Sequence, residues 1–450
     1  MELFAVPFQD AWLLYRPLAR LAIVANRAMA DLASRKAADP DAPIAEQERE
    51  ACDYLRAIGF LDPDPPPPGA STPNDPYRPT VAVLCLTTAC NLRCVYCYAR
   101  GGEGSPRVLP IELGRLAIET ACRNARRKGE EHFGLVFHGG GEPTLAMREM
   151  RALVEHARAM SLQCRISTAS NGCWSQRDED WLLDNIDEVS LSLDGAEAVQ
   201  NRQRPFADGS SSFGRALAAA QTLDRRRVAY GIRLTVTDEA IEELPAGLER
   251  LCRETACQVF QVEPAFPHGR ARHDDRALTR HERFARAFFK GVDVAEAHRR
   301  HVYYSGARPW LSTARFCQAI DSAMVVTPEG ALTACYEVCG PDHPLVSRFS
   351  FGTIDQDGAR FHEASRRAFI ERIDDRRRAC STCFCCWHCA GDCPSKTLTP
   401  DGAADLAFGD RCQLNRTITR QLLLRWVEAG GGMWRGDSEP LRRLLPEECR

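Results

Sequence analysis

Short apolar segments alternate with helix-like segments through the middle of the chain, from residue 78 to residue 271. The apolar segments are strand-sized, and helical patterns lie between them. The predicted strands are 81–86, 134–138, 163–168, 188–193, 229–236 and 258–263, and the predicted helices include 111–128 and 147–160. Strands that alternate with helices are typical of a parallel sheet, so the pattern predicts an α/β fold.

The pattern differs on both sides of this region. Residues 1–61 combine short apolar runs with helical patterns, which predicts a small α+β domain. The segment 62–77 contains consecutive prolines, and because proline favours an extended backbone we predict a semi-rigid linker there. The remaining predicted units are a polar helical bridge at 272–316, a cysteine-rich domain at 317–420, and a C-terminal helix and tail at 421–450.

Cysteine content separates this chain from an ordinary globular protein. There are 21 cysteines in 450 residues, yet the N-terminus lacks the basic and apolar regions of a signal peptide, which argues against a secreted disulfide-rich protein. A cytoplasmic protein with this many thiols is expected to bind metal. A net charge of −3 does not indicate a basic surface that binds nucleic acid. The sequence also has no apolar run long enough for a transmembrane helix, so none is predicted.

Three cysteines follow the first strand of the central region. Cys90, Cys94 and Cys97 lie on one short segment, which Thr87 and Thr88 separate from the strand. Three thiolates do not complete a structural zinc site, because such a site takes four protein ligands. They can hold three irons of a [4Fe–4S] cluster and leave the fourth iron open. The alternative is that they are ordinary core cysteines of a cysteine-rich chain.

The CxxxCxxC spacing, with Tyr96 before the last cysteine, resembles the signature of the radical SAM superfamily. The resemblance implies a partial (β/α)6 barrel, and in parallel barrels the chemistry collects at the carboxyl ends of the strands. It also implies that the open iron binds S-adenosylmethionine (SAM) and that an electron from the cluster splits SAM into methionine and a 5′-deoxyadenosyl radical. The expected protein is therefore an iron–sulfur oxidoreductase.

Two further turns resemble SAM-binding turns of that family. Gly140, Gly141 and Glu142 follow the second strand and match the GGE motif, whose backbone and carboxylate hold the methionine amino group of SAM. Ser192 begins a turn that resembles the SxDG motif, and Arg204 lies near the place of an arginine that binds the SAM carboxylate. The alternative for Arg204 is a surface arginine.

A second group of cysteines lies toward the C-terminus. Two of them flank a predicted β-hairpin at 323–334, and others follow between 380 and 412. This order resembles the SPASM domain, which implies two auxiliary [4Fe–4S] clusters and hence three clusters in all. By position, the first auxiliary cluster takes Cys317, Cys335 and Cys393, and the second takes Cys380, Cys383, Cys389 and Cys412. The alternative is a pair of zinc ribbons, which are also built from CxxC units.

Two details of these ligand sets stay open. The first auxiliary cluster lacks a fourth ligand, because Leu311 stands where sulfatase-maturing relatives have a cysteine. Cys339 is the candidate replacement, and the alternative is an open iron that binds a substrate thiolate. Cys386 also permits a competing register, in which it joins Cys383 and Cys389.

The SPASM resemblance implies a maturase that oxidises a peptide or protein. The predicted substrate is a ribosomally made peptide that receives a thioether, carbon–carbon or carbon–oxygen crosslink. Residues 1–61 resemble a peptide-recognition domain, and the alternative is an N-terminal extension that only packs on the rest. A flavodoxin or ferredoxin is the expected electron donor. No catalytic base stands out, although Tyr336, Glu337 and Glu263 are candidates.

Other functions stay open at this point. One is an anaerobic sulfatase-maturase, although the aspartate that such enzymes place after the second SPASM cysteine is replaced here by Tyr336. Another is a cofactor-biogenesis enzyme that acts on a protein side chain. A third, from a different class, is a non-catalytic iron–sulfur or zinc protein.

Overall fold

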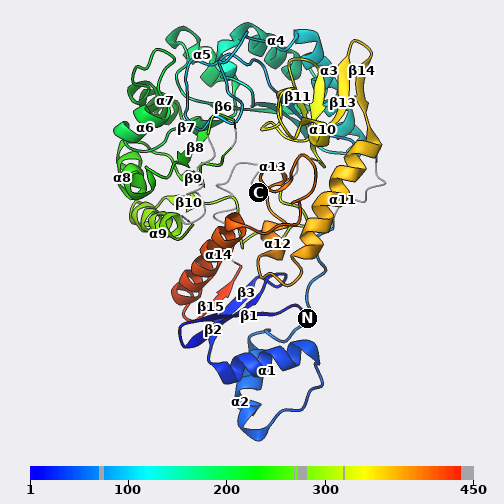
Figure 1. The fold of residues 1–450 in the computed structure, drawn as a ribbon, viewed down its shortest axis with the longest axis vertical. Coiled ribbons are helices and arrows are strands. Elements are labelled where there is room, and N and C mark those ends of the chain that lie inside the picture. The colour runs from blue at the N-terminus through cyan, green and yellow to red at the C-terminus, as the bar shows by residue number, and fades with distance from the viewer. Residues whose placement is uncertain (70–75, 268, 272–280, 318–319, 437–450) are drawn as a thin grey trace.

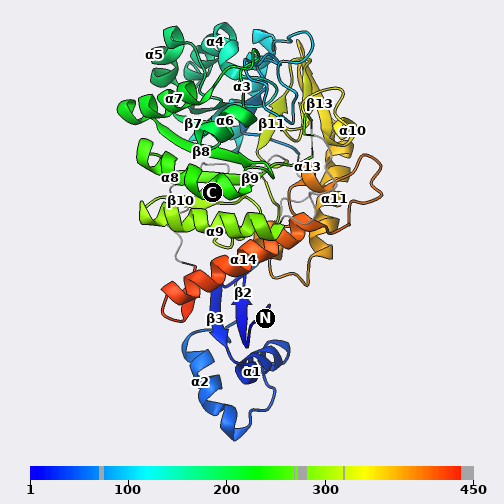
Figure 2. The same ribbon diagram turned by 60° about the vertical axis from the view of Figure 1, so that its left-hand side comes forward.

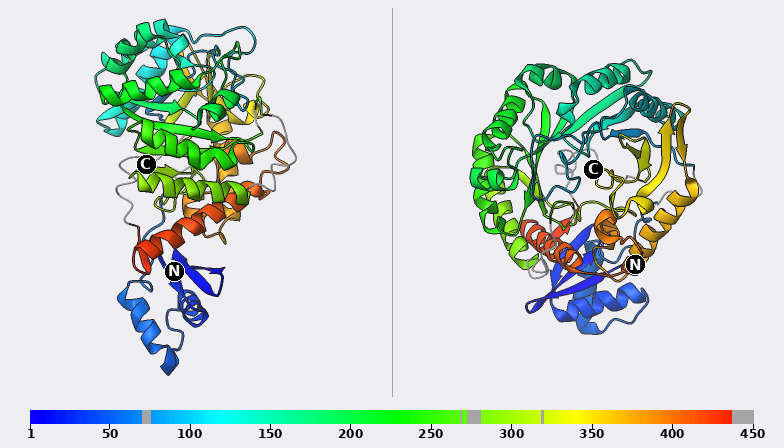
Figure 3. Two further views of the ribbon diagram at one scale, coloured as in Figure 1. Left: turned by 90° about the vertical axis from the view of Figure 1, so that its left-hand side faces the viewer. Right: turned by 45° about the horizontal axis from the view of Figure 1, so that its top comes forward.

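The computed structural model describes the chain except for residues 70–75, 268, 272–280, 318–319 and 437–450. Within the described residues the largest feature is an 11-stranded sheet that curves into a partial barrel with helices on its outside (Figures 1 and 3). The strand order is β10-β9-β8-β7-β6-β5-β4-β11-β12-β13-β14. The predicted α/β fold is confirmed.

The predicted strands of the central region are confirmed as parallel neighbours in chain order. They are β4 (Val81–Leu84), β5 (His132–Phe137), β6 (Gln163–Ser170), β7 (Glu188–Ser192), β8 (Ala229–Val236) and β9 (Val259–Pro264). The connecting helices are α3 (Ile111–Lys128), α4 (Met147–Arg158), α5 (Gln176–Asn185), α6 (Glu197–Gln203), α7 (Phe213–Arg226) and α8 (Leu244–Glu254), with the short 3-10 turns η2 (Pro143–Leu145) and η3 (Ile241–Glu243). Strand and helix residues such as Leu135 and Leu153 share one buried core, which holds the helices on the sheet.

The segment after β9 continues the same sheet. Its helix is α9 (His281–Ala297), and β10 (His301–Tyr303) then pairs in parallel with β9. A strand this short shows no alternating pattern, which explains why the sequence predicts only helix there. The predicted hairpin is confirmed as β11 (Ala323–Val326) and β12 (Ala331–Thr333), and β11 also pairs with β4. The cysteine-rich region therefore begins as an extension of the barrel sheet.

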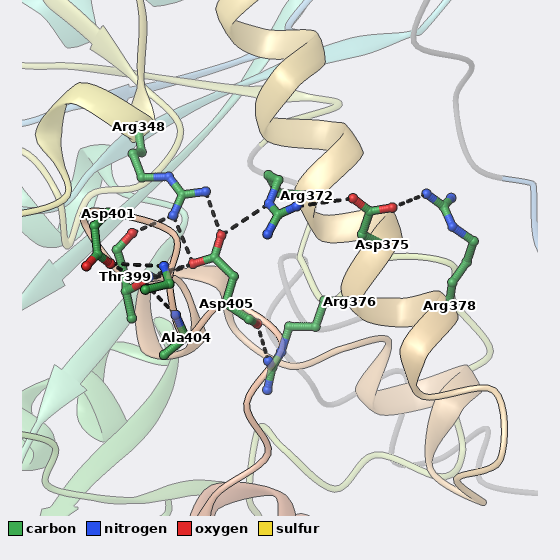
Figure 4. A network of polar contacts seen from close by, with 10 residues as sticks. Arg348, Arg372, Asp375, Arg376, Arg378, Thr399, Asp401, Ala404 and Asp405 are labelled. Atoms are coloured by element: carbon green, nitrogen blue, oxygen red, sulfur yellow. Dashed lines mark hydrogen bonds and ion pairs between the residues drawn. The ribbon is translucent and has the colours of Figure 1, made fainter.

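The rest of the cysteine-rich region is mostly helical. Its elements are α10 (Val346–Phe349), β13 (Ser350–Asp355), β14 (Gly358–Phe361), α11 (Glu363–Ala379), α12 (Cys386–Cys389), α13 (Pro394–Thr397) and α14 (Asp410–Ala429). Arg376 of α11 and the segment around Asp405 contact each other, so that the segment between α13 and α14 is held against α11 (Figure 4). This contact fixes where α14 begins, two residues before Cys412.

Asp405 is the centre of that contact. Its carboxylate is 1% exposed and pairs with Arg348 at 2.7 Å and with Arg372 at 3.2 Å (Figure 4). Burial alone raises the pKa of a carboxyl group, but hydrogen bonds from Arg348 and from the Thr399 N–H outweigh it and lower the pKa of Asp405 to about 2. Asp405 is therefore a buried, ionised carboxylate that ties several segments together.

A smaller antiparallel sheet lies at the N-terminus. Its order is β1 (Phe4–Phe8), β2 (Ala11–Arg16), β3 (Leu21–Ala25) and β15 (Met433–Arg435). Helices α1 (Arg27–Ala38) and α2 (Arg49–Ala57), with the turn η1 (Glu46–Glu48) before α2, contribute to the core on one face, and α14 crosses the other face (Figure 2). Part of the segment predicted as a C-terminal tail is thus a strand of the N-terminal sheet.

No helix among the described residues combines the length and the apolar character needed to span a bilayer.

Candidate functional site

The cysteine loop, residues 90–97, is folded against the segment that follows α6. The backbone N–H groups of Arg93 and Val95 donate to the carbonyl oxygens of Pro205 at 2.8 Å and Gln203 at 2.9 Å. The residues packed together in this way are Cys90, Leu92, Cys94, Tyr96, Cys97, Cys173 and Phe206. The structure therefore gathers the three predicted thiol ligands in one small cluster beyond the carboxyl end of β4.

The surroundings of this loop favour the neutral form of two of its thiols, Cys90 and Cys94, when no metal is bound. Burial, together with the Glu142 carboxylate, raises the pKa of Cys90 to about 12. Burial also raises the pKa of Cys94, although the nearby Arg204 opposes this effect. Metal ligation requires the thiolate, so a bound cluster would displace these protons.

The turn after β5 passes directly beneath the cysteine loop. The N–H of Gly141 donates to the carbonyl oxygen of Thr87 at 2.6 Å, and the N–H of Glu142 donates to that of Ala89 at 2.8 Å. A Cβ atom on residue 141 would lie 1.9 Å from the Ala89 oxygen, and Gly140 adopts a φ of +71°. Only glycine fits this approach, which agrees with a backbone that must come close to a ligand.

Glu142 ties this turn to the end of β6. Its Oε1 accepts hydrogen bonds from the hydroxyls of Ser170 at 2.7 Å and Thr144 at 2.8 Å, and its Oε2 accepts one from the Asn171 N–H at 2.9 Å. Burial raises the pKa of Glu142, and these hydrogen bonds oppose the rise. The expected contact between this carboxylate and the amino group of SAM stays a prediction, since both oxygens already accept protein hydrogen bonds.

Arg204 lies beside the cysteine loop and is not a surface residue. It is 8% exposed, donates to the Tyr96 hydroxyl at 2.9 Å, and lies 3.7 Å from the Asp194 carboxylate. Its buried Nε atom has no hydrogen-bond partner among the described residues. An unused donor on a buried cation fits an anionic ligand such as a carboxylate. Ser192 ends β7, in register with Arg233 of β8.

The predicted ligands of the first auxiliary cluster are brought together. Burial, the Glu337 carboxylate, and the neighbouring Cys393 and Cys317 thiols raise the pKa of Cys335. Ser395 also approaches Cys393, with 3.1 Å between Oγ and Sγ. Cys335 accepts a hydrogen bond from the Glu337 N–H at 3.4 Å. These three thiols, Cys317, Cys335 and Cys393, are called the trio below.

The four thiols predicted to hold the second auxiliary cluster also lie close enough to affect one another. Burial and the neighbouring Cys383 raise the pKa of Cys380 to about 11, with a smaller contribution from Cys412. Cys412 contributes in the same way, after burial, to the raised pKa of Cys389. These thiols, Cys380, Cys383, Cys389 and Cys412, are called the quartet below.

Two other cysteines point elsewhere. Cys339 packs against Cys85, and a hydrogen bond between the two thiols raises the pKa of Cys85 and lowers that of Cys339. Cys335 also contributes to the raised pKa of Cys85, so Cys339 lies near the trio and its role as the fourth ligand stays a prediction. Cys386 donates to the Glu2 carboxylate at 3.2 Å, which directs its thiol toward the N-terminal sheet.

Aromatic and charged side chains line the region between the cysteine loop and the trio. The rings of His138 and Tyr336 stack with 3.8 Å between centroids, and Tyr98 lies 6.4 Å from Tyr336. Burial and the nearby Arg233 lower the pKa of His138 to about 3, so this imidazole is neutral at physiological pH. His138 is absent from the sequence-based candidates. The sequence feature that could have identified it is its position between a strand and the turn at Gly139.

Glu337, a candidate base from the sequence, is ionised and paired. Its carboxylate accepts hydrogen bonds from Lys396 and Ser395, both at 2.6 Å. Burial raises its pKa, but Lys396, Ser395 and Arg233 outweigh burial and lower the pKa to about 2. Glu263, another candidate, accepts hydrogen bonds from Gln261 at 3.0 Å and from the Ser305 N–H at 2.9 Å.

The spacing of the thiols bears on the type of metal site. In the parts of the chain that the structure describes, no three His, Cys, Asp or Glu side chains converge as one metal ion requires. In a [4Fe–4S] cluster each thiolate binds a different iron, so the ligands are spread around the cluster. The predicted ligands of all three sites are thiols, and thiolate is the usual ligand of such clusters.

Comparison with known proteins agrees with this geometry. Residues 84–246 match the Radical SAM superfamily. The serine-type anaerobic sulfatase-maturating enzyme of Klebsiella aerogenes is 25% identical over 358 residues, which cover 73% of this chain and 82% of that protein. The mycofactocin maturase MftC of Mycolicibacterium smegmatis is 25% identical over 324 residues, which cover 68% of this chain and 76% of that protein.

Solved structures share the fold. Native anSMEcpe with bound AdoMet aligns with a TM-score of 0.62 at 18% identity and covers 78% of this chain and 99% of that chain. Streptococcus suis SuiB bound to S-adenosylmethionine aligns with a TM-score of 0.53 at 13% identity and covers 90% of this chain and 99% of that chain. At these identities the alignments bear on the fold alone.

The family match and the geometry meet in the same residues. The matched segment contains the cysteine loop, the glycine turn after β5, and Arg204. Proteins of this superfamily carry a [4Fe–4S] cluster and bind SAM, and the buried cation and close glycine backbone found here fit both. The matched residues 84–246 therefore form a radical SAM domain, which indicates that the protein is an enzyme.

Proposed function

We propose that this enzyme cleaves SAM and oxidises a side chain of a ribosomally made peptide, forming a thioether, carbon–carbon or carbon–oxygen crosslink. The observation that carries the proposal is the convergence of three segments near the carboxyl ends of β4, β5 and β7. These segments are the cysteine loop, the glycine turn after β5, and Arg204. Ligands of parallel barrels bind at this end of the strands.

Each part of this site has a role in the proposal. Cys90, Cys94 and Cys97 would hold the SAM-binding cluster, while the backbone at Gly141 and the Arg204 guanidinium would hold SAM. When bound, the cluster and SAM supply a carbon-centred radical, which removes hydrogen from carbons that no acid or base can activate. Arg204 orients the carboxylate of SAM through its unused nitrogen.

The aromatic residues near the trio would bind the substrate side chain. The stacked rings of His138 and Tyr336 present an apolar surface that excludes water from the reacting carbon. The Glu337 carboxylate is engaged by Lys396 and Ser395, whereas the Tyr336 ring lies against His138 and Tyr98, between the cysteine loop and the trio. Tyr336 is therefore our candidate for the residue that handles the substrate proton.

Two auxiliary clusters complete the proposed set of cofactors. The quartet would hold one of them with four thiolates. The trio would hold the other, whose fourth iron is bound by Cys339 or left open to substrate. A flavodoxin or ferredoxin would supply the electron for SAM cleavage.

The names of related proteins support a peptide or protein substrate. They include the sporulation killing factor maturation protein SkfB of Bacillus subtilis, 26% identical over 210 residues, and the sulfatase-maturating enzyme and MftC named above. A sulfatase-maturase function is the second candidate on the strength of the Klebsiella match. Tyr336 in place of an aspartate argues against it, and we favour the peptide crosslinking function.

The first experiment tests SAM cleavage. The protein is reconstituted anaerobically with iron and sulfide, reduced with dithionite and supplied with SAM, and 5′-deoxyadenosine is measured by chromatography. We expect the parent protein to release 5′-deoxyadenosine and Cys94→Ala to release none. Cys52→Ala, at a buried position of the N-terminal core, is the matched control and keeps the activity. Cleavage by Cys94→Ala contradicts the assignment of the loop.

The second experiment tests the substrate class. Short peptides encoded beside the gene are incubated with enzyme, SAM and reductant, and their masses are measured. A crosslink removes two hydrogen atoms from the peptide, so we expect that mass loss to depend on SAM. Unchanged masses, combined with formylglycine formation on a sulfatase-derived peptide, would favour the second candidate.

A further inference from the structure

One thiol of the quartet has a buried side-chain hydrogen-bond donor of its own. The Nδ2 atom of Asn415 lies 3.3 Å from the Sγ atom of Cys389. Asn415 is 1% exposed and lies on α14, one turn beyond Cys412, while Cys389 is the final residue of α12. The side chain thus joins the two helices that carry ligands of the same proposed cluster.

Tyr304 fixes the orientation of this amide. Its hydroxyl donates to Oδ1 of Asn415 at 2.8 Å, and both side chains are buried. Gly306 leaves the space that the amide needs, because a Cβ atom there would lie 2.2 Å from Oδ1. A thiolate accepts hydrogen bonds and cannot donate them, so Oδ1 faces the tyrosine and Nδ2 faces the sulfur.

A cation lies near another thiol of the quartet. The Nη2 atom of Arg376 is 3.9 Å from Sγ of Cys412, and the guanidinium also donates to the carbonyl oxygens of Gly391 at 2.7 Å, Asp405 at 2.5 Å and Ala407 at 3.0 Å. The hydrogen bonds of the Arg376 guanidinium go to carbonyl oxygens, and among the described residues it forms no ion pair with a carboxylate. The quartet therefore lies beside a neutral donor and a fixed positive charge, and the nearby Asp392 carboxylate is itself paired with Arg411 at 2.5 Å.

The electrostatic effect of these groups has a definite sign. A reduced cluster carries one more negative charge than an oxidised one, and hydrogen bonds to its sulfur ligands stabilise that charge. We propose that Asn415 is a positioning residue that raises the reduction potential of the cluster held by the quartet. This makes that cluster the better electron acceptor. The inference rests on the proposed function in one respect, namely that the quartet holds a cluster.

The test is an anaerobic redox titration followed by EPR spectroscopy. The reconstituted full-length protein carries Cys94→Ala, which removes the signal of the SAM-binding cluster and leaves two auxiliary transitions. Adding Asn415→Leu, which keeps the volume and deletes the donor, is expected to move one transition to a more negative potential and leave the other unchanged. Tyr304→Phe is expected to move the same transition in the same direction by less, because the amide stays but loses its anchor.

A matched control and a second variant keep the outcome decisive. Asn124→Leu deletes a buried amide that donates to the Pro79 carbonyl oxygen at 2.9 Å, far along the chain from the quartet, and neither transition should shift. If Asn415→Leu loses its cluster, Asn415→Asp replaces it; a carboxylate beside the sulfur must then lower the potential.

The failure of the inference differs from the failure of the proposed function. Unchanged potentials in Asn415→Leu or Asn415→Asp, at the iron and sulfide content of the parent, overturn the role of Asn415 and leave the proposed function standing. Iron and sulfide for only one auxiliary cluster in the parent, with loss of none in Cys412→Ala, mean that the quartet holds no cluster. That result overturns the proposed function of this region.

Discussion

The cysteine loop and the quartet place their thiols in different surroundings. At the loop, a glycine turn packs closely against the Ala89 carbonyl oxygen, and the buried Nε of Arg204 has no partner in the described chain. At the quartet, Asn415 donates to Cys389, and Arg376 lies beside Cys412. The unpartnered nitrogen of this buried cation suits the anionic ligand that we propose for the loop. Protein side chains contact the thiols of the quartet directly. This suits a cluster that exchanges electrons and binds no further ligand.

The largest expected effect comes from filling the space at the loop. Gly141→Ala places a methyl group 1.9 Å from the Ala89 carbonyl oxygen, so the turn or the loop must move. A displacement of about 1 Å at a reacting centre costs roughly a hundredfold in rate, and we expect at least that loss of 5′-deoxyadenosine formation. Gly214→Ala is the control, because a Cβ atom there meets nothing within 4 Å. Full activity in Gly141→Ala would show that the turn does not limit the loop.

The second effect concerns the scaffold of the quartet. Asp405→Asn leaves Arg348 without its carboxylate and Arg372 with Asp375 alone, and breaking a buried ion pair costs about 3 kcal/mol of unfolding free energy. Urea unfolding measures this loss, with the exposed Asp401→Asn as control. A value below about 1 kcal/mol would mean that the network contributes little more than a surface pair.

The same variant has a pH signature. The pKa of Asp405 in the folded protein is lowered to about 2, below the unfolded value of about 3.9. Its contribution to stability is therefore complete above about pH 4 and is lost as the pH falls toward 2. Asp405→Asn should remove that part of the acid sensitivity.

A smaller effect is expected at the ligand side of the loop. Arg204→Met removes a buried cation, and a hydrogen bond to a charged group is worth about 1.5–3 kcal/mol, so the KM for SAM should rise by roughly 10-fold to 100-fold. Arg202→Met is the control, since Arg202 pairs at the surface with Glu243 at 2.8 Å and should change the KM by less than about twofold. Equal behaviour of the two variants would remove Arg204 from the SAM site.

The smallest expected effect tests whether Cys386 is a ligand in addition to the quartet. Cys386→Ser keeps a hydrogen-bond donor to Glu2 and removes a thiol that we do not count as a ligand. Iron content, sulfide content and 5′-deoxyadenosine formation should all match the parent. Loss of cluster iron would favour the competing register that includes Cys386.

The strands of the barrel were open to prediction because their residues are local and repetitive. The apolar run at Val81–Leu84 and the spacing of the apolar positions in Ile111–Lys128 need no knowledge of the rest of the chain. Short strands such as β10 and β15 lack such a signal, because pairing with a distant strand defines them. The hydrophobic pattern therefore predicts the strands of the barrel but not β15, which pairs with β3 of the N-terminal sheet.

The site was predictable to the extent that spacing alone determines it. Residue spacing places Cys90, Cys94 and Cys97 on one loop, since neighbours in sequence are neighbours in space. The direction of a side chain depends on the local backbone and on packing. Ala390, with a φ of +47°, turns the chain directly after Cys389 in a way that composition does not indicate. The contact of Cys339 with Cys85 likewise arises from tertiary packing.

The strand β15 has a consequence for how the protein is made. Residues 4–25 leave the ribosome early, but the edge of their sheet is filled by Met433–Arg435, and the apolar side chains of Leu13 and Tyr15 are covered by Leu423 and Trp434. During synthesis that apolar face stays exposed until nearly the whole chain has emerged. The nascent protein thus needs protection, by a chaperone or by rapid completion, before its first residues reach their final state.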